Sequence, residues 1–281
     1  MPTREQLRAL VDEMPAADDR GMYTKQIDKQ RIEKAVAEIL RGSRDGVLGL
    51  IDMLGEPGSP QDVKPRYALH CVVNRALIEK DKSAQEMLSE TLAAALKSDR
   101  PKHVKAFLCQ ELQWAGTSAA APALGTLLLD EDLVEAAAMA LVAIRQGAAD
   151  QFRAALPAAK GKCRLSIVQG LGAVEDPASI PALRAALQDS DADVRLAAGW
   201  GLARLADAGS ADLLLQAADA ERGWNRSQAT KHCLLLAEKL AATGNKGVAA
   251  KIYRHLAVTR TDAAERYIRS LAEKALSAEA P

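Results

Sequence analysis

The stretch that decides the fold is Asp176–Asp207, with the sequence DPASIPALRAALQDSDADVRLAAGWGLARLAD. Its first half places apolar side chains at helical spacing after Pro177, a residue that the first turn of a helix tolerates. The polar run QDSDAD then interrupts the pattern. In the second half, apolar side chains return along one helix face, at Val194, Ala198 and Leu202. The stretch therefore predicts two helices joined by a short polar turn.

This helix pair recurs along the chain. With Arg195 as the register mark of the second helix, equivalent positions return at intervals of roughly 30 to 40 residues, which is typical of helical repeats. The residues three and seven positions after each mark are apolar in all six segments. Such agreement indicates a true repeat. The six marks, of which five are basic, are Arg66, Lys105, Glu135, Arg164, Arg195 and Arg226.

Three features of the deciding stretch are typical of one repeat family. Pro177 leads the first helix, aspartates fill the turn, and Asp193, Val194 and Arg195 open the second helix. In these features the chain resembles the HEAT repeat, most closely its phycobilisome-lyase-like subfamily. The resemblance is strong over residues 117–207 and weaker elsewhere. It implies an all-α fold, a right-handed α-α superhelix (a HEAT-like solenoid) of about seven helix pairs whose second helices line a concave groove.

The repeats divide the chain into three expected parts. Residues 1–42 are expected to form N-terminal capping helices, including the linker PAADDRG and a helix over Thr24–Arg41. Residues 43–276 are expected to form the HEAT-like repeat solenoid. Residues 277–281 are expected to be a C-terminal tail.

The composition favours helices and argues against several functions. Hydrophobic residues make up 48% of the chain and aromatic residues only 3%, so Ala, Leu, Val and Ile must build the core. The 37 basic and 37 acidic side chains cancel, which argues against nucleic-acid binding. No apolar run is long enough to span a membrane. The start of the chain lacks an apolar signal core, which predicts a cytoplasmic protein unless a signal peptide has been removed.

The sequence contains no catalytic or metal-binding motif. Its four cysteines form no CxxC pair, which predicts small buried side chains rather than a zinc site. The four histidines form neither HExxH nor the His-Glu pairs with which deoxyhypusine hydroxylase, a HEAT protein, binds iron. No catalytic residue, metal or cofactor is therefore predicted.

The basic register marks allow two interpretations. They form either a ladder that binds phosphates or a set of ion pairs, as in HEAT-like repeats, where this arginine typically pairs with turn aspartates of its own or the neighbouring repeat. The second interpretation is favoured because exposed rows of like charge repel one another. Asp189, Asp191 and Asp193 are available as partners.

Helical geometry predicts where a partner would bind. Residues one, five and eight positions after each mark lie opposite the core, and Lys231 is the only charged residue among them, whereas solvated helix faces are normally charged. We interpret this stripe as a binding groove, and packing between repeats is the alternative. The irregular loop Glu221–Gln228 adds further candidates. The predicted partner-binding residues are Tyr67, Asn74, Gln110, Gln113, Gln169, Trp200, Lys231, Trp224, Asn225 and Arg226.

Trp200 lies between Gly199 and Gly201, and each glycine costs a helix roughly 1 kcal/mol relative to alanine. The glycines therefore indicate a close approach, either by a neighbouring helix or by a partner segment that lies across the indole. The second interpretation is preferred.

The sequence thus predicts a non-catalytic protein-binding or scaffold module that grips a helix or extended segment of another protein. The alternative is a HEAT-like enzyme, such as an alkylpurine DNA glycosylase or a bilin lyase. A glycosylase would need a basic groove with a carboxylate beside aromatic residues, and the stripe has one cation and no carboxylate. No residue supports the lyase beyond the family resemblance.

Overall fold

The computed structural model describes residues 3–16, 22 and 27–278. Over these residues the chain forms α-helices and short 3-10 helices and no β-strand, which confirms the all-α class. In the same ranges, no helix combines the length and the apolar character that crossing a membrane requires. The chain divides into two compact units, unit 1 over Met1–Gln151 and unit 2 over Phe152–Pro281, and the division falls inside the expected repeat region.

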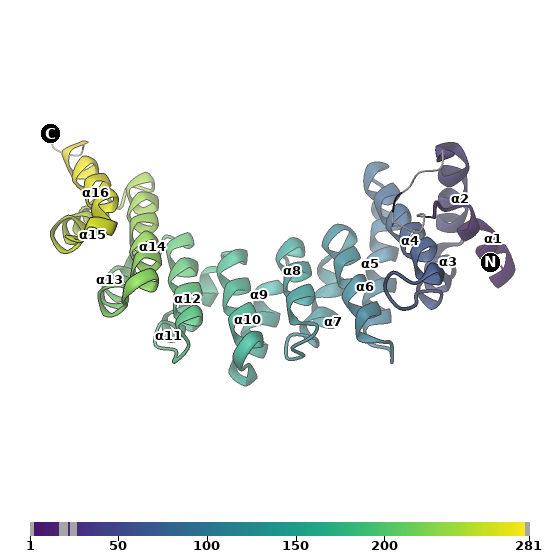
Figure 1. The fold of residues 1–281 in the computed structure, drawn as a ribbon, viewed down its shortest axis with the longest axis horizontal. Coiled ribbons are helices and arrows are strands. Elements are labelled where there is room, and N and C mark those ends of the chain that lie inside the picture. Colours follow the sequence, from purple (N-terminus) through teal and green to yellow (C-terminus); the bar gives the residue numbers. More distant parts are fainter. Residues whose placement is uncertain (1–2, 17–21, 23–26, 279–281) are drawn as a thin grey trace. The chain divides into compact units, whose positions relative to one another are not determined.

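Unit 1 contains two N-terminal helices followed by three helix pairs, coloured from purple to teal in Figure 1. The N-terminal helices are α1 (Arg4–Asp12) and α2 (Lys29–Arg41). The pairs are α3 (Ser43–Asp52) with α4 (Pro60–Ile78), α5 (Lys82–Leu96) with α6 (Lys102–Ala115), and α7 (Ala121–Gly125) with α8 (Val134–Ile144).

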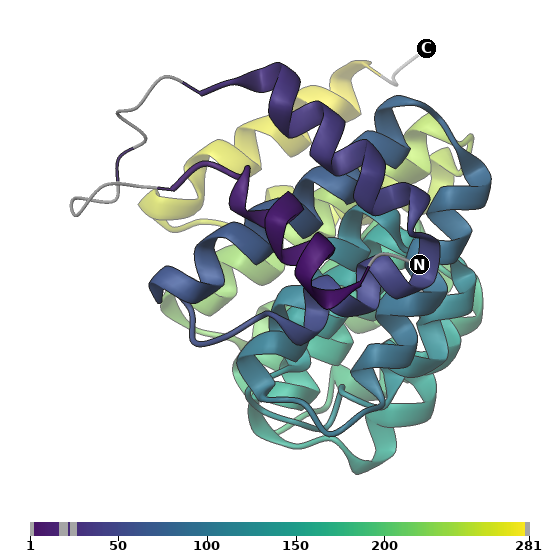
Figure 2. The same ribbon diagram turned by 90° about the vertical axis from the view of Figure 1, so that its right-hand side faces the viewer.

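The N-terminal helices pack against the first pair, where α1 contacts α2, α3 and α4 (Figure 2). Thr3 caps α1 because its hydroxyl accepts from the Gln6 amide and the Gln6 side chain accepts from the Thr3 amide. The helix expected over Thr24–Arg41 begins only at Lys29, because Asp28 is extended and caps it. Residues 17–21 of the expected linker and residues 24–26 lie outside the described residues.

Unit 2 continues the same architecture. Helix α9 (Ala148–Ala155), which spans the division between the units, precedes α10 (Gly161–Val174). The expected helix pairs are confirmed, and seven follow one another over the described residues. The last helix extends to Ala278, two residues beyond the expected boundary of the tail. The remaining pairs are α11 (Ile180–Ala186) with α12 (Ala192–Arg204), α13 (Ala211–Ala220) with α14 (Gly223–Ala242), and α15 (Lys246–Thr259) with α16 (Arg266–Ala278).

The core follows the register of the sequence. Positions three after the marks are buried in all six second helices, and positions seven after are buried in all but one, where Val142 is half-buried. Burial of these side chains is the main source of stability, at roughly 1.5–3 kcal/mol for each large one. Three of the four cysteines are buried as expected, and Cys71 is half-buried.

The register arginines form ion pairs, which confirms the favoured interpretation. In unit 2 each one reaches a carboxylate of the next repeat: Arg164 donates to Asp189, Arg195 to Glu221 and Arg226 to Glu265. Asp191 is expected to pair with a register arginine, but it does not. Its carboxylate instead accepts a hydrogen bond from the Asp193 amide and caps α12. These arginines therefore connect neighbouring repeats.

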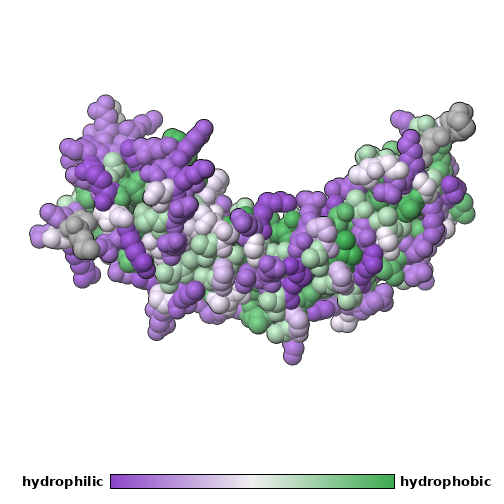
Figure 3. Space-filling view, turned by 180° about the vertical axis from the view of Figure 1, so that it is seen from behind, coloured by the Kyte–Doolittle hydropathy of each residue, from purple (hydrophilic) through white to green (hydrophobic). Residues whose placement is uncertain are grey.

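Hydrophilic side chains cover most of the face shown in Figure 3, with smaller apolar patches between them. Isolated exposed apolar residues are normal on protein surfaces. Trp114 and Met139 are different, because they project from the adjacent helices α6 and α8 and remain 62% and 60% exposed. Both side chains line a hollow between α4, α6 and α8.

Candidate functional site

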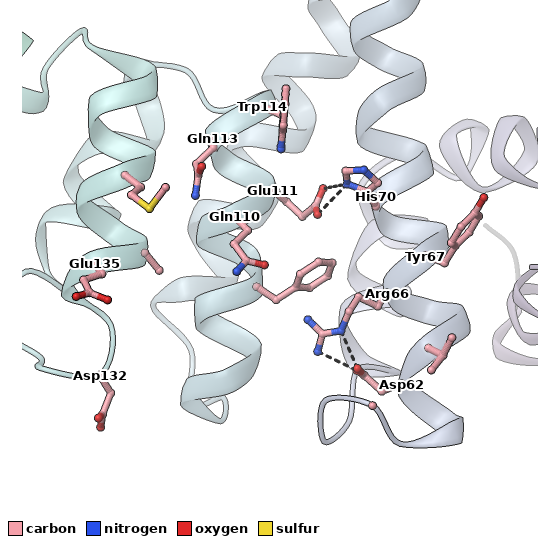
Figure 4. Close-up of a pocket in the computed structure, with 15 residues that line it drawn as sticks. Asp62, Arg66, Tyr67, His70, Gln110, Glu111, Gln113, Trp114, Asp132 and Glu135 are labelled. Atoms are coloured by element: carbon pink, nitrogen blue, oxygen red, sulfur yellow. Dashed lines mark hydrogen bonds and ion pairs between the residues drawn. The ribbon is translucent and has the colours of Figure 1, made fainter. Parts of the chain in front are cut away.

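Unit 1 contains a hollow of about 840 Å³ between α4, α6 and α8 (Figure 4). The second helices supply its walls, and the loop before α4 lies at its edge. Three predicted residues, Tyr67, Gln110 and Gln113, meet here as expected from the stripe. The hollow is lined by Gly58, Asp62, Val63, Arg66, Tyr67, His70, Phe107, Gln110, Glu111, Gln113, Trp114, Asp132, Glu135, Ala136 and Met139.

The loop over residues 55–59, which precedes α4, lies at the edge of the hollow through Gly58. Gly58 adopts a positive φ of 80°, a conformation that side chains with a Cβ rarely adopt, and Pro60 starts α4. The Gly55 amide donates to the Asp62 carboxylate at 3.0 Å. The loop is thereby attached to the helix whose side chains line the hollow.

Arg66 is held in place on the floor of the hollow. Its Nε and Nη2 donate to the Asp62 carboxylate at 2.7 and 3.1 Å, and its guanidinium carbon lies 4.1 Å from the centre of the Phe107 ring. Asp62 is only 1% exposed, so this bidentate pair is largely removed from water. The charge of Arg66 is therefore balanced, and the contacts join α4 to α6.

A second polar pair lies beside the first. Glu111 is 3% exposed, and His70 Nδ1 lies 3.1 and 3.2 Å from its two carboxylate oxygens. Burial raises the pKa of Glu111, and the nearby charges of His70 and Arg66 partly oppose that rise. When Glu111 is ionised, His70 Nδ1–H donates to it, which fixes the orientation of the imidazole ring.

The hollow presents both large apolar side chains and polar amide side chains to the solvent. Trp114 and Met139 stand exposed on α6 and α8, with exposed Gln110 and half-buried Gln113 on the same α6 face. In Figure 4, Trp114 lies above Glu111 and His70, Gln113 points from α6 toward α8, and Gln110 lies lower on α6. Such a surface offers a large apolar contact together with amide groups that can both donate and accept.

The sequence stripe missed Trp114, Met139, His70 and Glu111. It counted one, five and eight residues after each mark, whereas Trp114 lies nine after Lys105 and Met139 four after Glu135. A signal did exist, since Trp114 follows Gln110 by one helical turn and so shares its face. Which other residues line the hollow depends on how each helix is rotated relative to its neighbours, and the count along one helix does not include that rotation.

The other predicted residues are distributed differently. Asn74 is half-buried on α4, outside the lining of the hollow. Gln169 and Lys231 are exposed on α10 and α14 of unit 2. At the start of α14, Trp224 is 66% exposed, whereas Asn225 and Arg226 are half-buried. Parts of the stripe are fully buried and pack inside their units: Ala140, Gly172, Leu196 and Ala203.

Trp200 takes part in packing between helices. A Cβ added to Gly172 of α10 would lie 2.8 Å from the Gly201 Cα and 3.0 Å from the Trp200 ring, so α10 and α12 approach closely there. On the indole, the Arg204 guanidinium lies 4.8 Å from the ring centre. The neighbouring helix therefore accounts for the close approach at Gly201, while the half-buried Trp200 stays a predicted partner-binding residue.

Comparisons with known proteins agree with this architecture. Residues 149–234 match a family model described as HEAT repeats. The crystal structure of an engineered protein is 17% identical, with a TM-score of 0.47, and the match covers 97% of this chain and 78% of that one. The karyopherin Kap121p, bound to the extreme C-terminus of the protein phosphatase Cdc14p, is 14% identical with a TM-score of 0.54.

The Kap121p match covers 98% of this chain but only 35% of the karyopherin, so the chain spans about a third of its length. At this identity the similarity shows the fold alone. No curated protein matches the sequence. The family match identifies HEAT repeats over residues 149–234, and the similarity to Kap121p supports the all-helical fold of the chain.

Proposed function

We propose that this chain is a protein-binding scaffold and that the unit 1 hollow grips a helix or an extended segment of another protein. The observation that carries the proposal is the exposure of two large apolar side chains, Trp114 on α6 and Met139 on α8, in a hollow that also contains two polar pairs. Large apolar side chains that remain exposed on neighbouring helices are typical of interfaces, and tryptophan is enriched among the residues that dominate binding energy.

The geometry of the floor favours binding over catalysis. Arg66 is balanced by Asp62, and Glu111 by His70, so both pairs act as a fixed polar platform. Among the described residues that line the hollow there is no serine, threonine or cysteine to act as a nucleophile. The enzyme alternative, the phycobilisome-lyase-like subfamily and the cytoplasmic location stay predictions, since the lining does place the carboxylate Glu111 with the aromatic residues Phe107 and Trp114.

The Kap121p structure offers a precedent for this use of the fold, because it holds a terminal segment of another protein. For the present chain such a segment is part of the proposal. An extended or helical segment fits a hollow that is lined by three second helices, since amide side chains such as Gln110 and Gln113 can bond to its backbone.

The test is a pull-down from the source cells with the tagged full chain and two variants. Trp114→Ala removes the central apolar contact of the hollow, whereas Trp224→Ala removes an equally exposed tryptophan of unit 2. We expect partners to be lost with the first variant and kept with the second. Binding is then repeated with the purified partner.

Thermal melting controls for folding, because both tryptophans are exposed and their loss should leave stability nearly unchanged. Retention of every partner by Trp114→Ala would refute the role of the hollow. Loss with Trp224→Ala alone would move the binding site to the loop that the sequence predicted.

A further inference from the structure

We propose that the segment gripped by the unit 1 hollow is extended rather than helical, that Gln110 and Gln113 hold it through its backbone, and that it carries a large apolar side chain instead of a charged one. This inference rests on the proposed function, because it names the conformation and the chemistry of the partner for the same site. An amphipathic helix and a charged segment are the alternatives.

The charged side chains that line the hollow are already engaged. Glu135 on α8 has an interaction partner of its own. The other charged groups form pairs between side chains, which are Arg66 with Asp62 at 2.7 Å, His70 with Glu111 at 3.1 Å, and Lys102 with Asp132 at 2.7 Å. A charged side chain of a partner would have to compete with these existing pairs. An uncharged segment therefore complements the lining best.

Two amide side chains of the hollow are free to form hydrogen bonds. Gln110 is exposed and Gln113 is half-buried, and neither amide has a hydrogen-bond partner among the described residues. Both lie on α6, and Gln113 points from α6 toward α8 (Figure 4). A primary amide has two N–H donors and one carbonyl acceptor. Each glutamine can therefore accept from the N–H and donate to the C=O of a peptide backbone.

The backbone groups of the partner decide between an extended and a helical segment. Within a helix the N–H and C=O groups bond to one another, so Gln110 and Gln113 would find no backbone partner along its body. In an extended segment these groups are unpaired, and burying them without partners is costly. The two amides supply partners, as the edge of a sheet does when a peptide adds to it as a strand. The hollow therefore favours the extended segment.

The exposed apolar side chains select what the segment carries. Trp114 on α6 and Met139 on α8 are 62% and 60% exposed. Ala136, which lies one helical turn before Met139, also lines the hollow and is small, so it leaves space for a bulky side chain. Successive side chains of an extended segment point to opposite sides. One large apolar side chain can therefore cover Trp114 and Met139 while the backbone passes the glutamines, and its burial favours binding.

The experiment selects short random peptides displayed on phage against the purified full chain, with removal of binders that also hold the Trp114→Ala variant. Enriched peptides are synthesised, and their affinities are measured by fluorescence anisotropy. We expect a large apolar residue in the peptides, and we expect affinity to depend on side chains at alternate positions rather than three or four positions apart. Raising the salt from about 50 to 500 mM should change affinity by less than about twofold, because no ion pair forms on binding.

Glutamine variants test the contacts to the backbone. Gln110→Met and Gln113→Met keep the length of the side chain but remove its amide, and each should weaken the peptides roughly threefold to tenfold. Gln169→Met makes the same change at an exposed position on α10 of unit 2, and should change affinity by less than about twofold. Thermal melting of all three variants separates a loss of binding from a loss of folding.

An ester in place of one peptide amide tests the same contact from the side of the partner, because it removes a single N–H donor. At the residue that Gln110 contacts, the ester should weaken binding to the wild-type protein roughly threefold to tenfold. It should leave binding to Gln110→Met nearly unchanged, because the acceptor is already absent. A helical peptide would lose the same affinity for both proteins, since the ester would break a hydrogen bond inside the helix.

The outcomes separate the two proposals. Peptides that depend on Trp114 but bind Gln110→Met and Gln113→Met with wild-type affinity, or whose required side chains recur three or four positions apart, overturn the extended segment and leave the scaffold function standing. Peptides that require a charged residue and weaken steeply with salt overturn the apolar side chain and also leave that function standing. A library without any binder that depends on Trp114 overturns the binding role of the hollow, and this inference with it.

Discussion

His232 shows what the burial of a single residue does to its chemistry. The side chain lies on α14 beside Gly199 of α12, where a Cβ added to the glycine would be 3.3 Å from Nδ1. Among the described residues, this buried Nδ1 has no hydrogen-bond partner. Burial, with a smaller effect of the neighbouring Lys231 charge, lowers the pKa of His232 from 6.5 to about 4. The folded state therefore keeps His232 neutral.

This leads to a prediction about acid stability. Because the folded-state pKa is depressed, the stabilisation is complete above pH 6.5 and is lost as the pH falls toward 4. Between about pH 7.5 and pH 4.5 the loss amounts to roughly 2–3 kcal/mol of unfolding free energy. His232→Leu removes the titrating group, so this variant should lose that much less over the same interval.

The measurement is urea unfolding followed by tryptophan fluorescence in a Trp114→Phe background, in which only Trp200 and Trp224 of unit 2 report. Other titrating groups are common to both proteins, so the difference isolates His232. Parallel stability profiles for the two proteins would contradict the prediction.

Trp200 gives a second prediction about stability. Its ring contacts Gly172 and lies beside the Arg204 guanidinium, so Trp200→Ala should lower the unfolding free energy by about 3 kcal/mol. Trp224→Ala, which removes a side chain that is 66% exposed, should cost less than about 0.5 kcal/mol. Urea unfolding of both variants compares them, and near-wild-type stability of Trp200→Ala would restore the partner interpretation.

Within the helices, glycine has opposite effects on stability at two positions. A Cβ on Gly201 of α12 would lie 2.9 Å from the Gly172 Cα and 3.1 Å from Leu183, whereas one on Gly247 of α15 would meet nothing within 4 Å. Gly201→Ala should therefore destabilise the protein by about 1–3 kcal/mol, because α10 and α12 must separate. Gly247→Ala should stabilise it by up to about 0.5 kcal/mol through helix propensity.

Each glycine variant is the control for the other, because both replace a glycine within a helix by alanine. Melting temperatures should move in opposite directions. A gain in stability for Gly201→Ala would show that the contact between α10 and α12 is looser than the distances indicate.

The sequence predicts the helix pairs better than it predicts the hollow. The register of apolar residues predicted the helix pairs and their buried faces, because burial follows the period of a single helix. The hollow was only partly predictable: Gln110 followed from the stripe, but His70 and Glu111 did not. Their pairing depends on how α4 and α6 lie side by side, which no count along one helix contains. The same applies to Gly172 beneath Trp200.

Over the whole molecule, arginine charge is used to connect repeats. Besides the register arginines, Arg153 donates to Asp176 and Arg184 to Asp207, each in the following repeat. These pairs are partly buried, so each is harder to break than a surface ion pair. The arginines that are engaged in this way are less available to a polyanion, and the chain as a whole carries no net positive charge.

We therefore predict no useful affinity for duplex DNA at about 150 mM salt. Binding would require several phosphate contacts, because each neutralised phosphate adds to the counterion release that drives association. Arg164, Arg195 and Arg226 would have to exchange carboxylates of their neighbouring repeats for phosphates. A gel-shift assay with the full chain should show no complex at micromolar protein. A stable complex under these conditions would contradict the prediction. It would show that enough basic side chains remain free of ion pairs to bind phosphates, and the DNA glycosylase would again be a candidate function.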